Sequence, residues 1–224
     1  AGPEAAPVVE VLDVSEHHIS VRHLEAVRPT GAAMESFGWE LAATHSAGAA
    51  AFGQPPDGWD EDGFIGTQPL SLRPHSTWGD FYAEQRLLPY AKQAHRIGNL
   101  DDAVLRSVDR VSGRLRAGVY DDGTAPARIH GDLWAGNLIW TADGAVLIDP
   151  AAHGGHGLTD LAMLALFGAP GLVAILGAYA EAADLPDGWR DLIGLHQLHP
   201  LLVHAVTHGP RYGAEAGRVA QHYL

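Results

Sequence analysis

Two short motifs on either side of a predicted β-hairpin constrain this chain more than any other feature of its sequence. The first is HGDLWAGN at residues 130–137, and the second is LIDP at residues 147–150. The residues between them, 138–148, have the pattern of two strands joined by a Thr-Ala-Asp-Gly turn. Because antiparallel pairing brings the two ends of a hairpin together, we expect Asn137 and Asp149 to lie side by side.

The polar residues of these motifs match what phosphoryl transfer requires. Amide and carboxylate oxygens, such as those of Asn137 and Asp149, are suited to Mg²⁺. Asp132 lies between two glycines and can face the same cavity without being a ligand, so it can orient a substrate hydroxyl and accept its proton. The alternative is structural, because Asp, Asn and Gly also form tight turns. For each residue alone the structural alternative is simpler, but the ordered set of three favours a catalytic centre.

The remaining sequence predicts a mostly helical α+β fold with two small β-hairpins. Besides the central hairpin, strands are expected at Val8–Val14 and His18–Val27. Residues 48–76 are rich in Gly and Pro, which predicts a long loop. Caps and apolar periodicity predict helices at residues 30–45, 77–97 (bent at Pro89), 101–118, 158–167, 172–183 and 187–224.

Composition restricts the classes of partner. The chain has 27 acidic and 14 basic residues and a formal charge of −13, which argues against binding to nucleic acids or anionic membranes. It has no cysteine, so it has no disulfide and no thiolate metal site. Leu161–Ala180 carries no charge, but a Gly-Ala-Pro-Gly break at residues 168–171 favours two buried helices over a membrane span. The N-terminus has no secretory signal pattern, and a cytoplasmic location is expected.

The motif HGDLWAGN followed by LIDPAAHGGHGLTDLAML resembles the fructosamine kinase family, which has the aminoglycoside-phosphotransferase and protein-kinase-like fold. The stretches FGWELAATH, TWGDFYAEQRLLPYAKQA and LHQLHPLLVHAVTHGPRY are also similar to that family, so the resemblance covers most of the chain. It implies a protein-kinase-like α+β fold that is predominantly the helical C-terminal lobe with a central β-hairpin. Residues 1–28 would be a remnant of the small lobe and the hinge, and residues 29–224 the large catalytic lobe.

The resemblance also implies a function: ATP- and Mg²⁺-dependent phosphoryl transfer to a sugar hydroxyl of a ketosamine, as in the fructosamine and ribulosamine kinases of protein deglycation. A ketosamine, free or protein-bound, would be the substrate, with no nucleic acid and no membrane as partner. The implied roles are a catalytic base at Asp132, Mg²⁺ ligands at Asn137 and Asp149, loop support from His130 and Asp160, a sugar-pocket wall at Trp134, and an adenine-binding hinge at Arg22, His23, Leu24 and Glu25.

Two features depart from the family pattern. Gly157-Leu158 occupies a place where the family usually has Arg-Glu. No glycine-rich turn and no lysine precede the hinge-like strand, since the sole lysine, Lys92, lies in a later helix. The chain is therefore expected to begin within the small lobe and to turn over poorly by itself. Two alternatives remain open: a kinase of another small hydroxylated amine, such as an aminoglycoside or choline, and a non-catalytic sugar-binding module without a phosphate clamp.

Clustered histidines raise the separate possibility of a zinc site. His196, His199, His204 and His208 lie near one helical stripe, but Pro200 interrupts it and no HExxH motif occurs. Histidines with ordinary hydrogen bonds are therefore favoured.

Overall fold

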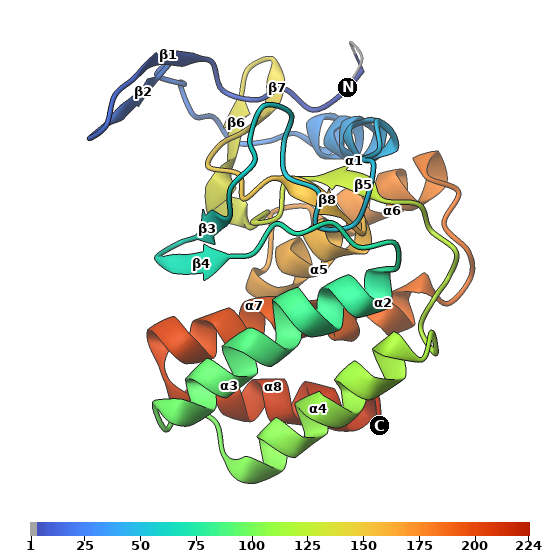
Figure 1. Ribbon diagram of the computed structural model, residues 1–224. Coiled ribbons are helices and arrows are strands. Elements are labelled where there is room, and N and C mark those ends of the chain that lie inside the picture. Colours follow the sequence, from blue (N-terminus) through green and yellow to red (C-terminus); the bar gives the residue numbers. More distant parts are fainter. Residues whose placement is uncertain (1–3) are drawn as a thin grey trace.

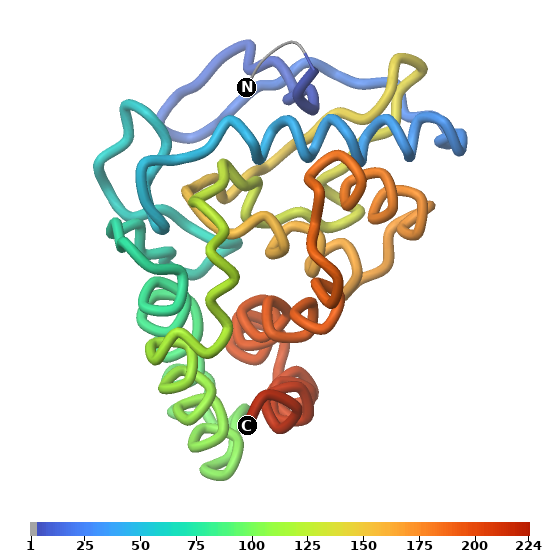
Figure 2. Tube along the Cα trace, turned by 90° about the vertical axis from the view of Figure 1, so that its right-hand side faces the viewer, coloured from blue at the N-terminus to red at the C-terminus, as the bar shows by residue number. Residues whose placement is uncertain are grey.

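The computed structural model describes residues 4–224, with the strands at one end of the molecule and a group of packed helices at the other (Figure 1). Helices α1 (Gly31–Ser46), α5 (Leu158–Phe167) and α6 (Leu172–Ala182) accompany the strands, and α1 packs along α6. Figure 2 shows α1 running across that end while the chain terminates in the helices at the opposite end. The predicted α+β class, with far more helix than strand, is confirmed.

Both predicted hairpins are present. β6 (Leu138–Thr141) pairs antiparallel with β7 (Gly144–Leu147), with Leu138 opposite Leu147. β1 (Val11–Val14) pairs with β2 (Ile19–Val21), and the residues of both strands are exposed. The assignment of residues 1–28 to a small-lobe remnant stays a prediction, and residues 1–3 lie outside the described part of the chain.

The prediction of only two hairpins was wrong. Within the described residues, β3 (Gly63–Ile65) pairs with β4 (Gln68–Leu70) inside the expected loop, and β5 (Ala127–Ile129) pairs with β8 (His153–Gly155). In β8 the glycines are required by packing rather than by a turn. A Cβ on Gly154 would lie 2.1 Å from the carbonyl oxygen of Ala51. Glycine is typical of loops in the sequence, but here it lies in a buried strand because the neighbouring backbone leaves no room for a side chain.

The helix starts predicted from capping residues are confirmed. Thr30 Oγ1 accepts a hydrogen bond from the Ala33 amide at the start of α1, and Asp101 accepts one from the Val104 amide at the start of α4 (Asp102–Arg116). The chargeless stretch forms α5 and α6, and no helix in residues 4–224 is long and apolar enough to cross a membrane. The helical end is formed by α2 (Trp78–Phe81), η1 (Tyr82–Leu87), α3 (Leu88–Arg96), α4 (Asp102–Arg116), η3 (Trp189–Leu192), α7 (Ile193–His208) and α8 (Pro210–His222).

The helix predicted at residues 77–97 is not simply bent at Pro89. It starts at the expected Thr77 cap, but η1 is a π-helical segment that lies before the proline. Pro89 has no amide hydrogen for the preceding turn, and its ring excludes a normal approach of the carbonyl four residues earlier. The hydrogen-bond register therefore widens upstream, and Pro89 lies in the first turn of the regular helix α3.

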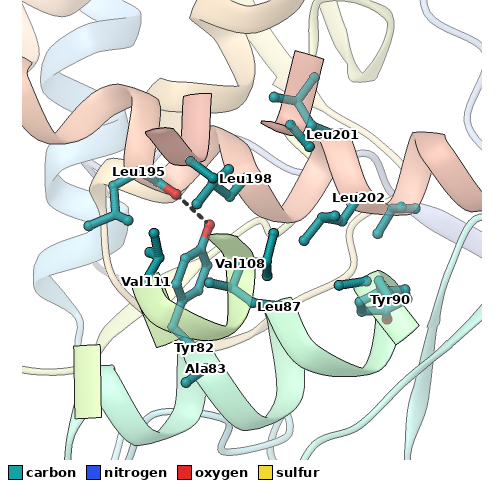
Figure 3. Packing of buried hydrophobic residues seen from close by; sticks show 14 of the residues in the cluster. Tyr82, Ala83, Leu87, Tyr90, Val108, Val111, Leu195, Leu198, Leu201 and Leu202 are labelled. Carbon is teal, nitrogen blue, oxygen red and sulfur yellow. Dashed lines mark hydrogen bonds between the residues drawn. The ribbon is translucent and has the colours of Figure 1, made fainter. Parts of the chain in front are cut away.

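Two apolar cores hold the site between them. At the helical end, Tyr82 and Leu87 pack against α4 and α7, and the Tyr82 hydroxyl lies within hydrogen-bond distance of the Leu195 carbonyl oxygen (Figure 3). The same hydroxyl is 2.8 Å from the carbonyl oxygen of His196. The aromatic residues at the start of this helix, Trp78, Phe81 and Tyr82, all belong to the core. At the strand end, Phe37, Leu41 and their neighbours from α1, α5 and α6 bury one face of the β6–β7 hairpin. The chain linking β5 to β6 carries the first motif, and its Leu133 belongs to the strand-end core.

Candidate active site

The β6–β7 hairpin brings Asn137 and Asp149 together, as its sequence predicts. The amide of Ile148 donates to the Asn137 carbonyl over 3.1 Å, which closes the open end of the hairpin. The Asn137 side chain lies beneath this closure, with its Nδ2 atom 3.4 Å from the Asp149 carbonyl oxygen. Asp149 has a φ of 50°, and it is one of two non-glycine residues with positive φ in the described chain. Positive φ at such a residue carries strain that the surrounding structure must hold.

Asp132 completes a group of three polar residues. Asn137 Nδ2 donates to the Asp132 carbonyl oxygen at 2.9 Å and to its carboxylate Oδ2 at 3.3 Å. Because the amide nitrogen of Asn137 is committed to these oxygens, its Oδ1 atom is directed away from them and is available to a cation. Partial burial raises the pKa of Asp132 to about 6, and the negative charges of Asp160 and Asp149 raise it further. The hydrogen bond from Asn137 acts in the opposite direction and lowers this pKa. This carboxylate is therefore more basic than an ordinary aspartate.

Asp160 holds the backbone before Asp132 in place. It is fully buried at the start of α5, and its two oxygens accept hydrogen bonds from the amides of His130 (2.8 Å) and Gly131 (2.9 Å). Gly131 has a φ of 82°, and a Cβ there would lie 2.2 Å from the carbonyl oxygen of Ala151. The loop therefore turns sharply at glycine and is fixed by one carboxylate.

His130 links the same loop to the end of the hairpin. Its Nε2 atom lies 2.9 Å from the carbonyl oxygen of Ile148, which can only accept, so Nε2 carries the hydrogen. Burial lowers the pKa of His130 despite the nearby Asp160 carboxylate, so the ring is neutral. Its Nδ1 atom is then an acceptor, and the amide of Asp132 donates to it over 3.3 Å. One imidazole thus connects Asp132 to the residue before Asp149.

Sequence reasoning missed two further members of this network, His45 of α1 and Tyr179 of α6. His45 Nε2 donates to Asp160 at 2.9 Å, and its Nδ1 is 2.7 Å from the Tyr179 hydroxyl. A Cβ at Gly157 would lie 2.5 Å from that hydroxyl and 2.8 Å from His45 Nδ1. The glycine that departs from the family pattern therefore makes room for this pair. Only the position of His45 on the apolar face of its helix hinted at burial.

The pKa of Asp160 reflects the strength of the hydrogen bonds that its carboxylate accepts. Burial alone would raise the pKa of Asp160, but the hydrogen bonds from the His45 side chain and from the His130 amide outweigh burial and hold that pKa below its usual value. The carboxylate is therefore ionised in the folded protein and able to accept from all three donors.

A cavity of about 460 Å³ opens beside Asp132, within the size range of small-molecule sites. Trp134 forms part of its wall and is 43% exposed. The indole lies across Gly136, where a Cβ would be 2.2 Å from its Cη2 atom. The full lining consists of Ile65, Gly66, Thr67, Asp132, Trp134, Met163, Phe167, Val203, His204, Thr207, His208 and Tyr212.

The stacking of Trp134 on Gly136 leads to a specific prediction. In Gly136→Ala, the new methyl group would displace the exposed indole, and we expect weaker binding of the cavity's ligand with less than about 1 kcal/mol change in unfolding free energy. Tryptophan fluorescence would detect the displaced indole, and its change on titration would report ligand binding. Thermal unfolding would measure the change in stability. Gly113→Ala, at a position of α4 with no atoms within 4 Å of the added Cβ, is the matched control and should leave the fluorescence unchanged. An unshifted spectrum in Gly136→Ala would contradict the packing described.

The β3–β4 hairpin supplies an outer wall that the sequence did not reveal. Its turn, Ile65–Thr67, lines the cavity, and side chains from η1 and α3 anchor the residues that follow. The Tyr90 hydroxyl donates to the carbonyl of Pro69 at 2.7 Å, and Arg86 Nη1 donates to that of Ser71 at 2.9 Å. These bonds join distant parts of the chain, so no local pattern announces them.

The four predicted hinge residues lie apart from this cavity. Arg22 follows β2 and pairs with Glu10, the Nε–Oε2 distance being 2.6 Å. The extended chain that continues from there reaches β6, where the Val27 amide donates to the carbonyl of Trp140. His23, Leu24 and Glu25 line none of the Asp132 cavity, and the hinge role stays a prediction.

The zinc alternative receives no support from the described residues, which contain no group of three or more His, Cys, Asp or Glu side chains placed to hold a metal. His196 and His199 are buried among aromatic rings, and burial lowers the pKa of each well below its usual value. His204 and His208 instead face the cavity beside Asp132.

Comparison with known proteins identifies the group to which this architecture belongs. Residues 7–224 match the family model described as fructosamine kinase. A "Probable ketoamine kinase" of Synechocystis sp. is 31% identical over 221 residues, covering 97% of this chain and 71% of its own. A second "Probable ketoamine kinase", from Enterococcus faecium, is 28% identical over 172 residues. This match covers 75% of the present chain and 61% of the length of the Enterococcus protein.

Solved structures agree with this match. The crystal structure of a "putative fructosamine-3-kinase" from Thermobifida fusca superposes with a TM-score of 0.91 at 47% identity, covering 98% of this chain and 74% of that one. The aminoglycoside phosphotransferase APH(4)-Ia, in a ternary complex with ADP and hygromycin B, has a TM-score of 0.57 at 19% identity over all of this chain and 78% of its own, a likeness of fold alone. The protein-kinase-like fold is thereby confirmed, and the chain belongs to the fructosamine kinase family.

Proposed function

We propose that the protein transfers the terminal phosphoryl group of ATP to a sugar hydroxyl of a ketosamine, in a reaction that requires Mg²⁺. The observation that carries this proposal is the convergence of Asp132, Asn137 and Asp149 at one end of a hairpin, beside a cavity that Asp132 lines. Membership of the fructosamine kinase family supports the substrate class.

The donor set fits a magnesium ion. Asn137 Oδ1 accepts no hydrogen bond from the described residues, and the Asp149 side chain is exposed and free of side-chain hydrogen bonds there. Amide and carboxylate oxygens are hard ligands, and two of them leave coordination positions for phosphate and water. When bound, Mg²⁺ would neutralise the charge that develops on the transferred group.

Asp132 would act on the acceptor. Its carboxylate is held by Asn137 and by the loop that Asp160 and His130 fix, so it is positioned before the substrate arrives. An acceptor hydroxyl in the cavity would donate to this carboxylate and lose its proton as the oxygen attacks phosphorus. Trp134 would offer its exposed indole face to the C–H surface of the sugar.

The nucleotide would lie toward the segment Arg22–Glu25, whose exposed backbone could bind adenine. ADP bound to a phosphotransferase of the same fold supports ATP as the donor. An aminoglycoside is disfavoured as the acceptor because, among the described residues, Asp132 is the only carboxylate that lines the cavity, whereas several ammonium groups would require several carboxylates. The formed network around Asp132 favours catalysis over a binding module.

A panel of acceptors tests this function directly. Fructosamines and ribulosamines, choline and an aminoglycoside would be incubated with Mg·ATP, and products would be analysed by mass spectrometry. We expect one phosphoryl group on a ketosamine, followed by slow loss of the sugar phosphate. Phosphorylation of choline or the aminoglycoside alone would overturn the substrate class, and absence of any product would overturn the kinase proposal.

Removal of a ligand tests the metal site. Because Asp149→Asn removes the charge but keeps the shape, we expect its affinity for Mg²⁺ with ADP to fall by about tenfold or more. Isothermal titration calorimetry with and without the metal would measure the change. Asp187→Asn, on an exposed loop far from the hairpin in sequence, is the control and should bind normally. Equal metal affinity in Asp149→Asn and the control would refute this ligand assignment.

A further inference from the structure

The cavity beside Asp132 has a second wall that the proposed transfer does not use. Four rings from the end of α5 and from α7 and α8 pack there: Phe167, His204, His208 and Tyr212. The centroid of His204 lies 4.9 Å from that of Phe167, 5.0 Å from that of Tyr212, and 4.8 Å from that of His208. His204 and His208 are stacked at 21°. This ring cluster is therefore continuous, and each of its members lines the cavity.

Both imidazoles of the ring cluster offer an acceptor nitrogen. His204 Nδ1 lies 2.8 Å from the carbonyl oxygen of Pro200, so Nδ1 carries the hydrogen. The Thr207 hydroxyl donates to the carbonyl of Val203, so its oxygen accepts from His208 Nδ1 at 2.7 Å. In a neutral ring the remaining nitrogen, Nε2, is then an acceptor. Burial lowers the pKa of His204, which keeps that ring neutral.

The ring cluster contains no carboxylate. Within residues 4–224, Asp132 supplies the only acidic side chain of the cavity, and the proposed transfer already uses it. Ring faces attract a single cation and pack well against planar or apolar groups. They offer no partner for further ammonium groups, whose removal from water would remain uncompensated. The chemistry of this wall therefore suits one protonated amine that carries an apolar substituent.

We propose that Phe167, His204, His208 and Tyr212 form the subsite for the amine half of the acceptor. This subsite selects a ketosamine with a planar, apolar substituent on nitrogen over one whose substituent carries another charge. The inference rests on the proposed function, because it takes the sugar half to lie at Asp132 and Trp134. The amine nitrogen would lie between the two halves, donating its N–H groups to an imidazole Nε2.

Binding of matched ligands tests this selectivity without turnover. Three ketosamines with the same ketose, derived from benzylamine, butylamine and 1,4-diaminobutane, would be titrated calorimetrically at 0.15 M salt to suppress long-range attraction to the acidic protein. We expect the benzyl compound to bind about three- to tenfold more tightly than the butyl compound, from the gain of aromatic packing. The diaminobutane compound should bind most weakly.

Variants assign the preference to the ring cluster. Tyr212→Leu should bring the benzyl-to-butyl affinity ratio close to one, whereas Tyr212→Phe should retain it because the ring remains. His222→Leu, on the same helix but outside this cavity, is the control and should keep the wild-type ratio. If Tyr212→Leu does not fold, His208→Leu takes its place, with the same expected loss.

Two results would overturn the inference: equal affinities of the three ketosamines for the wild-type protein, or an unchanged benzyl-to-butyl ratio in a folded Tyr212→Leu or His208→Leu variant. Phosphoryl transfer is measured in a separate assay. Its absence would refute the kinase proposal while leaving a measured binding selectivity in place, so the two failures are distinguishable.

Discussion

Asp132→Asn is expected to lower kcat for ketosamine phosphorylation by about 10²- to 10⁴-fold, the usual contribution of a positioned general base. The substituted side chain keeps its size, and the hydrogen bond from Asn137 Nδ2 to the main-chain carbonyl of residue 132 is unaffected. The variant loses only the ability to accept a proton from the acceptor hydroxyl. Thermal stability and nucleotide affinity should therefore stay close to those of the wild type.

The rate loss is measured in a coupled assay of ADP release at saturating Mg·ATP and ketosamine. Asp143→Asn is the matched control, because Asp143 lies exposed in the turn of the same hairpin and makes no side-chain hydrogen bond in the described structure. The control should retain full activity. Equal rates for Asp132→Asn and the wild type would show that another group handles the proton.

Asp160→Ala is expected to cost about 3–5 kcal/mol of unfolding free energy, because removing the buried carboxylate leaves three buried donors unsatisfied, at about 1–3 kcal/mol each. The donors are the amides of His130 and Gly131 and the side chain of His45. For a domain of this length the expected loss lowers Tm by roughly 6–20 °C. Differential scanning calorimetry would measure it.

An exposed ion pair provides the comparison. Asp102 pairs with His95 over 2.8 Å at the surface, and Asp102→Ala should cost less than about 1 kcal/mol. Equal destabilisation by Asp160→Ala and Asp102→Ala would show that the buried hydrogen bonds of Asp160 contribute no more to stability than a surface contact does.

The contribution of Asp160 also depends on pH. Its folded pKa is lower than its unfolded pKa, so its stabilisation is fully present above the ordinary aspartate value of about 4 and is lost as the pH falls through the folded value. The stability difference between wild type and Asp160→Ala should therefore shrink between neutral pH and about pH 3. Chemical denaturation at both pH values would measure it. A constant difference would contradict a carboxylate that is ionised in the folded state.

Those parts of the site that depend on residues close together in the sequence could be predicted. A hairpin with a short turn fixes its own register, so the proximity of Asn137 and Asp149 followed from their spacing. Caps such as Thr30 and Asp101 also act within one helical turn. Contacts between distant segments have no such local rule. His45 and Asp160 are 115 residues apart, and packing of α1 beside α5 and α6 alone brings them together.

Short strands and glycines account for the remaining differences. The strands β3, β4 and β8 have three residues each, too few for an alternating pattern to stand out. Glycine in β8 indicates a turn in isolation, but close approach of Ala51 requires it in the folded chain. The stripe of histidines in the ring cluster could be recognised from their spacing in the sequence. Its position beside Asp132 could not, because that position depends on how α7 packs against α5.

The most direct measurement is a crystal structure with Mn²⁺ in place of Mg²⁺, together with ADP, using anomalous scattering to locate the metal. Our account predicts an anomalous peak bound by the side-chain oxygens of both Asn137 and Asp149, with the carboxylate of Asp132 outside the coordination sphere and facing the acceptor cavity. A metal bound elsewhere, or bound by Asp132 with no contact to Asn137, would contradict it.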